Sequence, residues 1–79
     1  MPQTIARGTM KNGESIALID KRDAGEGHVV ICSKVNYSGG RNVRSWCRIY
    51  DPCDPTTRNL TLFGAIKVYN RRATTKVKP

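Results

Sequence analysis

The stretch "HVVICSKVNYSGGRNVRSWCRIY", residues 28–50, decides the fold because it has the pattern of two long β-strands joined by a tight reversal. Its first half is rich in β-branched residues, which favour strands because their side chains fit a pleated, half-buried surface. Gly39 and Gly40 in the middle can adopt the positive φ angles that short hairpin loops require. We therefore predict an antiparallel hairpin that reverses at these two glycines.

The length of this hairpin loop decides which residues face each other. A two-residue loop would place Ile31 opposite Arg48 and would mix apolar with charged side chains on one face. A three-residue loop, residues 38–40, gives one apolar face instead, and a slip of one residue turns every side chain to the other face. We therefore predict the second register, which pairs Val29 with Ile49, Ile31 with Cys47 and Val35 with Val43. Six side chains then point outward together: His28, Lys34, Arg44, Trp46, Arg48 and Tyr50.

Further strands are predicted on either side of this hairpin. Alternation marks "TIARGTM" (residues 4–10) and "ESIALIDKR" (14–22), and the Asn12-Gly13 pair between them is a strong hairpin signal. "NLTLFGAIKVYNR" (59–71) is predicted as the last strand, with a bulge or bend at Gly64. Asp54-Pro55 predicts a short 3₁₀ turn just before it, because these residue types suit the start of a helical turn.

Five short strands in sequential order predict an all-β fold, and more closely a small five-stranded antiparallel barrel. The layout resembles an SH3-like barrel most, with an OB-like barrel as the second choice. Residues 1–71 are predicted to form a single β-barrel domain. Residues 72–79 are predicted to form a basic flexible tail.

The chain of 79 residues carries a formal net charge of +8, which is distributed unevenly. Residues 1–40 hold five cations and four anions, whereas residues 41–79 hold nine cations and two anions, so the halves carry +1 and +7. Such an asymmetric positive charge attracts polyanions. The alternative is that the charge only keeps a small protein soluble.

Cations and aromatic rings alternate at every second position of residues 44–50, and similar residues recur in the last predicted strand, where Phe63 joins them. Such a face has the residue types of a nucleic-acid site, because rings stack on bases while cations follow the phosphates. Trp46 is the strongest single clue, since an indole exposed to water is expected to meet a ligand or a partner. Packing of Trp46 within the chain or in a dimer is the alternative. The predicted nucleic-acid-binding residues are Arg44, Trp46, Arg48, Tyr50, Lys67, Tyr69, Arg71 and Arg72.

The sequence supports no catalytic residue, metal ligand or cofactor. A single histidine and the lack of a nucleophile motif or paired carboxylates leave acid–base catalysis without candidates. Cys32, Cys47 and Cys53 are odd in number and lack the spacing of a zinc motif, so we predict free thiols. No apolar run approaches the ~20 residues that span a bilayer, and the N-terminus lacks the apolar stretch of a signal peptide. We therefore expect no membrane association and a cytoplasmic location.

These observations lead to two main hypotheses. The first is a small, non-enzymatic protein that binds nucleic acid, either DNA or RNA, or another phosphate-rich ligand through a basic-aromatic face of strands four and five. The alternative is a protein-binding inhibitor or adaptor of a phage or mobile element, which anchors on a host protein through Trp46 and its flanking arginines. A third hypothesis is a homodimer that forms through sheet edges.

Overall fold

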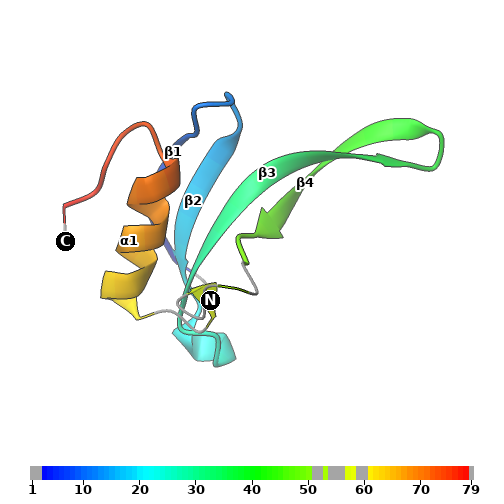
Figure 1. Cartoon of the computed structure of the whole chain (residues 1–79). Coiled ribbons are helices and arrows are strands. Elements are labelled where there is room, and N and C mark those ends of the chain that lie inside the picture. Colours follow the sequence, from blue (N-terminus) through cyan, green and yellow to red (C-terminus); the bar gives the residue numbers. More distant parts are fainter. Residues whose placement is uncertain (1–2, 51–52, 54–56, 59–60, 79) are drawn as a thin grey trace.

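The computed structural model describes residues 3–50, 53, 57–58 and 61–78, and within them it shows one antiparallel sheet with one α-helix against it (Figure 1). The four strands lie in the sheet in the order of the sequence. The elements are β1 (Gln3–Thr9), β2 (Ser15–Asp20), the 3₁₀ helix η1 (Arg22–Ala24), β3 (His28–Ser38), β4 (Arg41–Arg48) and α1 (Leu62–Arg72).

The predicted five-stranded barrel, whether SH3-like or OB-like, is wrong. The described sheet is open, with β1 at one edge and β4 at the other. Closure would need a further strand between those edges, and the segment predicted to supply it forms α1 instead. The 3₁₀ turn predicted at Asp54-Pro55 lies outside the described residues.

The segment predicted as the last strand is helical because its buried residues follow the period of a helix. Ala65, Tyr69 and Ala73 are buried at intervals of four residues, and Ile66 is buried three residues before Tyr69, which puts these side chains on one stripe. Thr61 caps the helix, since its hydroxyl oxygen accepts a hydrogen bond from the backbone N–H of Gly64 at 3.1 Å. The predicted bulge at Gly64 is therefore wrong as well, because this glycine lies in the first helical turn.

The first hairpin lies where the Asn12-Gly13 pair predicts it. Its loop spans residues 11–13, because the N–H of Met10 donates to the carbonyl oxygen of Glu14 at 2.8 Å. Gly13 has a φ of 86°, and the Asn12 side chain accepts a hydrogen bond from the Glu14 N–H at 3.0 Å. This side-chain turn and the left-handed glycine together reverse the chain.

The second hairpin has the register that the sequence argument rejected. Gly39 and Gly40 alone form the loop, so Ser38 faces Arg41, Ile31 faces Arg48 and Cys32 faces Cys47. The physical reason is that both glycines are left-handed, with φ of 60° and 81°, as a two-residue hairpin loop requires. Mixed polarity on one face is tolerated because the far part of this hairpin buries neither face.

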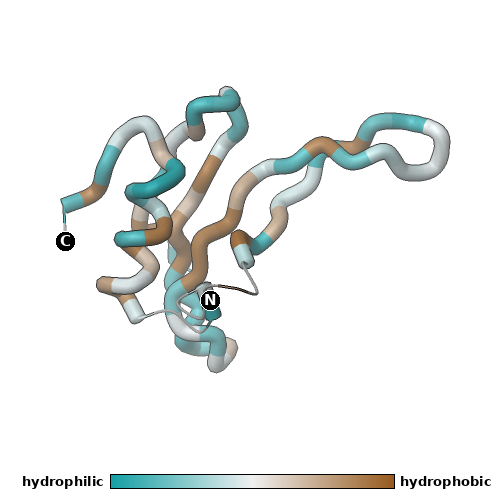
Figure 2. The backbone as a smooth tube through the Cα atoms, viewed as in Figure 1, coloured by the Kyte–Doolittle hydropathy of each residue, from teal (hydrophilic) through white to brown (hydrophobic). Residues whose placement is uncertain are grey.

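The core lies between α1 and one face of the sheet, where Figure 2 shows the apolar colour concentrated along β2 and the start of β3. Tyr69 is the largest fully buried side chain, at 1% exposure, and burial raises the pKa of its phenol. Gly8 on β1 makes room for it, because a Cβ there would lie 2.7 Å from the Tyr69 hydroxyl oxygen. The core residues are Ile16, Leu18, Val30, Ile49, Ala65, Ile66, Val68, Tyr69 and Ala73.

The residues that follow α1 return to the body of the protein. Ala73 forms an isolated bridge with Met10, and the Thr74 N–H donates to the Thr9 carbonyl oxygen at 2.8 Å. The Asn70 side chain exchanges two hydrogen bonds of 2.8 Å with the backbone of Val77. Helix α1 ends at Arg72, one residue after the predicted end of the domain at residue 71.

The observed register predicts that mild oxidation links Cys32 to Cys47 in preference to Cys53. Directly opposite residues of an antiparallel pair have Cα atoms about 4.5–5.5 Å apart, within the range that a disulfide spans. Treatment of the unaltered protein with oxidised glutathione, followed by peptide mass mapping, would show which of the three cysteines become linked. The register with Ile31 opposite Cys47 would put the two thiols on opposite faces, so failure to form this link would contradict the observed pairing.

Candidate nucleic-acid interface

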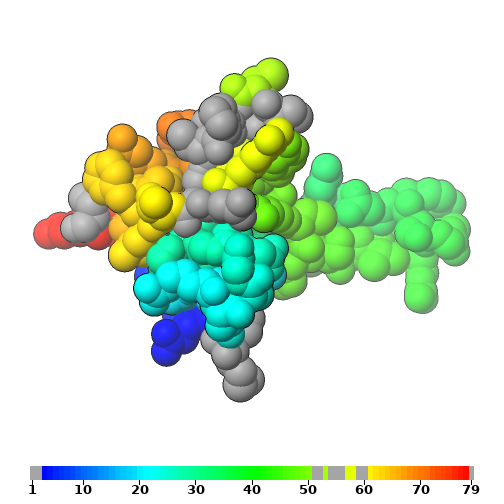
Figure 3. Space-filling view, turned by 90° about the horizontal axis from the view of Figure 1, so that it is seen from below, coloured from blue at the N-terminus to red at the C-terminus, as the bar shows by residue number. Residues whose placement is uncertain are grey.

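The far part of the β3–β4 hairpin projects from the body as an arm, residues 34–46, which Figures 1 and 3 show extending away from α1. Strand β2 pairs with β3 only as far as Cys32, so beyond that point β3 has β4 as its one described neighbour. Every residue from Lys34 to Trp46 is exposed. The arm is therefore accessible to a large ligand.

The register assigns the arm's side chains to two faces, because directly opposite residues of a pair point the same way and neighbours along a strand alternate. We call the face that continues the α1-covered side of the sheet the helix-side face, and the other the outer face. The outer face carries Val35, Tyr37, Asn42, Arg44 and Trp46. The helix-side face carries Lys34, Asn36, Ser38, Arg41, Val43 and Ser45.

Large apolar side chains are exposed on the outer face. Trp46 is 49% exposed, Tyr37 is 76% exposed and Val35 is 43% exposed. Trp46 lies opposite Ser33, whereas Tyr37 is four residues further along the same strand as Ser33. The two rings are therefore separated by about 13 Å along the ribbon.

The base of the arm is tied to the turn between β1 and β2 through Glu14. Its carboxylate accepts hydrogen bonds from Arg44 and from the Ser33 hydroxyl, the latter at 2.8 Å. The Ser33 oxygen in turn accepts from the Ser15 N–H at 3.0 Å. The hydrogen bond from Arg44, with a smaller one from Ser33, lowers the pKa of Glu14. Arg44 is thus partly neutralised by an acid of the body.

Arg48 lies at the end of β4, outside the arm, and its contacts stabilise this end of the strand. One guanidinium nitrogen is 3.7 Å from a Glu26 carboxylate oxygen, and another donates to the Thr57 carbonyl oxygen at 3.4 Å. Its Nε is buried and has no hydrogen-bond partner among the described residues. These contacts hold β4 against the loop that follows η1, so we assign Arg48 a structural role.

Uncompensated positive charge lies on the helix-side face. The sequence from Gly27 to Tyr50 contains no Asp or Glu. No acidic side chain in the described part of the chain forms an ion pair with Lys34 or Arg41. Burial and, to a lesser extent, Cys47 raise the pKa of Cys32 at the foot of this face, and the charges of Arg72 and Lys34 act in the opposite direction.

The structure does not bring the eight predicted site residues onto one surface. Arg44 and Trp46 share the outer face, but Lys67 and Arg71 lie on α1, which covers the opposite side of the sheet. Tyr69 lies in the core and cannot stack on a base in this structure. The register also puts Lys34 on the face opposite Trp46, and His28 is buried.

Two other cation–aromatic pairs lie away from the arm. The Tyr50 hydroxyl accepts a hydrogen bond from Arg58, whose guanidinium carbon is 5.0 Å from the ring centroid. On α1, the Lys67 ammonium lies 4.6 Å from the Phe63 ring centroid. These rings are already engaged by cations of the same chain.

Sequence reasoning missed Tyr37, Lys34 and Arg41 as members of the candidate interface. Their signal was the absence of acids between residues 27 and 50, together with the paired glycines that fix the register. With the two-residue loop, Tyr37 and Val35 fall on the same face as Trp46.

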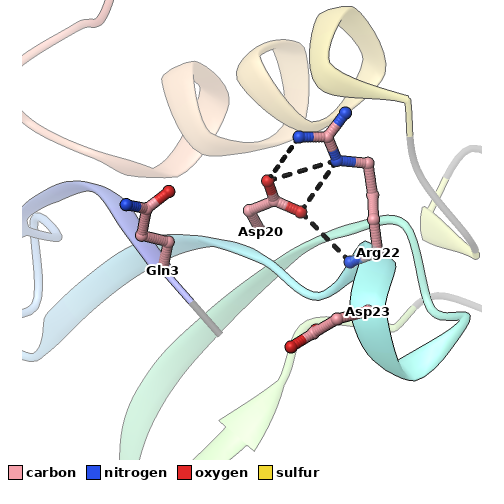
Figure 4. Close-up of a pocket in the computed structure, with 4 residues that line it drawn as sticks. All are labelled: Gln3, Asp20, Arg22 and Asp23. Carbon is pink, nitrogen blue, oxygen red and sulfur yellow. Dashed lines mark hydrogen bonds and ion pairs between the residues drawn. The ribbon is translucent and has the colours of Figure 1, made fainter. Parts of the chain in front are cut away.

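A surface pocket lies beside η1 (Figure 4). It is lined by Gln3, Asp20, Arg22 and Asp23. The Arg22 guanidinium lies 2.8 Å from an Asp20 carboxylate oxygen, and this bond lowers the pKa of Asp20 to about 2. Since Asp20 and Arg22 form an ion pair with each other, we assign the pocket no chemical role.

Comparison of the chain with protein-family models, with curated proteins and with solved structures gave no match. The helices in the described part of the chain are too short or too polar to cross a bilayer. Among the same residues, no three His, Cys, Asp or Glu side chains gather closely enough to hold a metal ion.

Replacing the buried Tyr69 with alanine should lower the free energy of unfolding by about 3–5 kcal/mol, because it leaves a cavity in the core. The matched control is Phe63→Ala on the same helix, where the ring is 59% exposed and the expected loss is below about 1 kcal/mol. Urea denaturation followed by circular dichroism measures both. Equal stability of the two variants would show that Tyr69 does not occupy the core.

Proposed function

We propose that this chain is a non-enzymatic protein that binds nucleic acid through its β3–β4 arm. The observation that carries the proposal is an exposed ribbon, residues 34–46, that contains no acidic residue and presents Trp46 and Tyr37 to solvent. Lys34 and Arg41 supply uncompensated positive charge on the helix-side face of the same ribbon, opposite to these rings. Rings and cations in this combination suit a ligand that has both flat bases and phosphates.

The cations and the aromatic rings would contribute to the free energy of binding in different ways. Each lysine or arginine that neutralises a phosphate releases counterions, which strengthens binding at low salt and makes it salt-dependent. Each ring that stacks on a base adds about 1–3 kcal/mol. Lys34 and Arg41 are expected to supply most of the salt dependence, since Arg44 already pairs with Glu14.

The proposed interface is smaller than the one expected from sequence. Arg44 and Trp46 remain in it, and Tyr37, Lys34 and Arg41 join them. The residues of α1 have no part in it, because the helix packs where β2 lies beside β3 and the arm extends beyond that part of the sheet (Figure 1). Nucleic acid is a ligand found inside the cell, and the three cysteines are free, as is usual in a reducing compartment. We therefore propose a cytoplasmic location.

A second candidate function is protein binding, which the composition of the outer face favours. Trp46, Tyr37 and Val35 are exposed beside the partly neutralised Arg44, and aromatic residues with arginine dominate the energy of protein interfaces. In this alternative the chain acts as a phage or mobile-element inhibitor or adaptor that anchors on a host protein. A protein that co-purifies with the chain after nuclease treatment, and is lost with Trp46→Ala, would favour it over the first proposal.

The test of the first proposal is fluorescence anisotropy with labelled oligonucleotides across a salt series. We expect binding that weakens steeply with salt, and a slope of log K against log[salt] that falls by about one for Lys34→Ala and again for Arg41→Ala. Trp46→Ala should weaken binding about tenfold, through loss of one stacking contact. The matched control is Lys67→Ala on α1, which removes the same charge far from the arm and should leave the slope nearly unchanged.

Two results would contradict the proposal. One is the absence of salt-dependent binding to any single-stranded or duplex probe. The other is an equal loss of affinity in the Lys67→Ala control and in the arm variants, which would indicate a general charge effect with no defined interface.

A further inference from the structure

We infer that the ligand of the arm is duplex DNA, and that the arm enters its major groove with the glycine tip first. This inference rests on the proposed function and narrows it. It is carried by a ribbon that has no third strand beside it among the described residues, with the cations Lys34 and Arg41 on its helix-side face and the rings of Tyr37 and Trp46 on its outer face.

The separation of cations and rings onto opposite faces favours a ligand that surrounds the arm. A single strand that lay along the outer face would leave Lys34 and Arg41 on the far side, without phosphate partners. A groove of duplex DNA instead presents a phosphate backbone on each wall. A ribbon that enters tip first turns one face towards each wall, so Lys34 and Arg41 meet the phosphates of one wall, while the outer face with Tyr37 and Asn42 lies against the other.

The dimensions of the arm fit the major groove. A two-stranded ribbon with side chains on both faces is about 10 Å thick, and the major groove is about 12 Å wide and admits such a ribbon. The minor groove, at about 6 Å, is too narrow for it. The five residues of each arm strand next to the loop span about 16 Å, which exceeds the groove depth of about 8.5 Å.

The tip is slim and chemically suited to contact base edges. A Cβ built at Gly39 or Gly40 would meet no atom within 4 Å, so the loop is narrow and free of neighbours. Arg41 follows directly, and arginine is the side chain that most often reads guanine through its N7 and O6 atoms. Asn36 and Asn42 lie within two positions of Ser38 and Arg41, the pair that flanks the loop. Their side-chain amides can form hydrogen bonds with adenine.

The spacing of the rings also favours a groove over a stacking platform. Proteins that bind single strands stack successive bases on neighbouring aromatic side chains. Trp46 and Tyr37 lie about 13 Å apart along the ribbon, with Arg44 between them on the outer face. Two rings this far apart do not form a continuous stacking platform for a single strand.

The inference is tested with a 20-base-pair DNA duplex, each of its single strands and an RNA duplex of the same sequence, by anisotropy at one salt concentration. We expect the DNA duplex to bind at least about tenfold more tightly than the other probes, because the RNA major groove is too narrow and deep for side chains to read. Binding of a single strand or of the RNA duplex as tight as that of the DNA duplex would overturn the inference and leave the proposed function intact. If no probe binds, both are overturned.

A second arm of the experiment tests the groove itself. A DNA duplex in which 7-deazaguanine replaces every guanine lacks the N7 acceptors of the major groove but keeps its phosphates. We expect this duplex to bind about fivefold to tenfold more weakly to the unaltered protein and no differently to the Arg41→Ala variant. Equal binding of both duplexes by the unaltered protein would overturn entry of Arg41 into the major groove. Arg41 is exposed beside the loop, so circular dichroism of the variant should match that of the unaltered protein.

Discussion

The left-handed pair Gly39-Gly40 is the constraint on which the rest of the candidate interface depends. Two consecutive residues with positive φ close the hairpin in two residues, and this loop length fixes every cross-strand pair back to Ile31 and Arg48. That register puts Trp46 on the outer face with Tyr37. A loop of one more residue would pair Trp46 with Cys32 and so turn it to the opposite side of the ribbon from Tyr37.

The body of the protein leaves the arm uncovered because its apolar surface is small. Helix α1 packs against the part of the sheet where β2 lies beside β3, and its buried stripe centres on Tyr69. Beyond Cys32 there is neither a third strand nor a helix among the described residues to cover the ribbon. The Glu14–Ser33 and Glu14–Arg44 hydrogen bonds hold the base of the arm, so its free part begins at a defined point.

The sequence predicted the strands up to residue 48 and the position of both hairpins, because alternation and glycine-containing turns are local signals. It did not predict α1, since the apolar residues of 59–71 satisfy both a period of two and a period of 3.6. The cap at Thr61 and the stripe through Ala65, Tyr69 and Ala73 distinguish them only when the partner surface is known. The register failed because the argument assumed that one face of the arm is buried. Of the candidate site, Arg44 and Trp46 could be placed side by side from alternation, whereas Tyr37 required the true register.

The most direct test of this account is a nuclear Overhauser measurement between α-protons across the arm. Val30 and Ile49 form a hydrogen-bonded pair, and the two kinds of pair alternate along the ladder, so Val35–Arg44 and Tyr37–Asn42 are non-hydrogen-bonded pairs with close Cα atoms. The account predicts strong contacts between the α-protons of these two pairs. It also predicts no contact between the Trp46 ring and α1. A strong contact between the α-protons of Val35 and Val43, or a Trp46 ring packed against the helix, would contradict it.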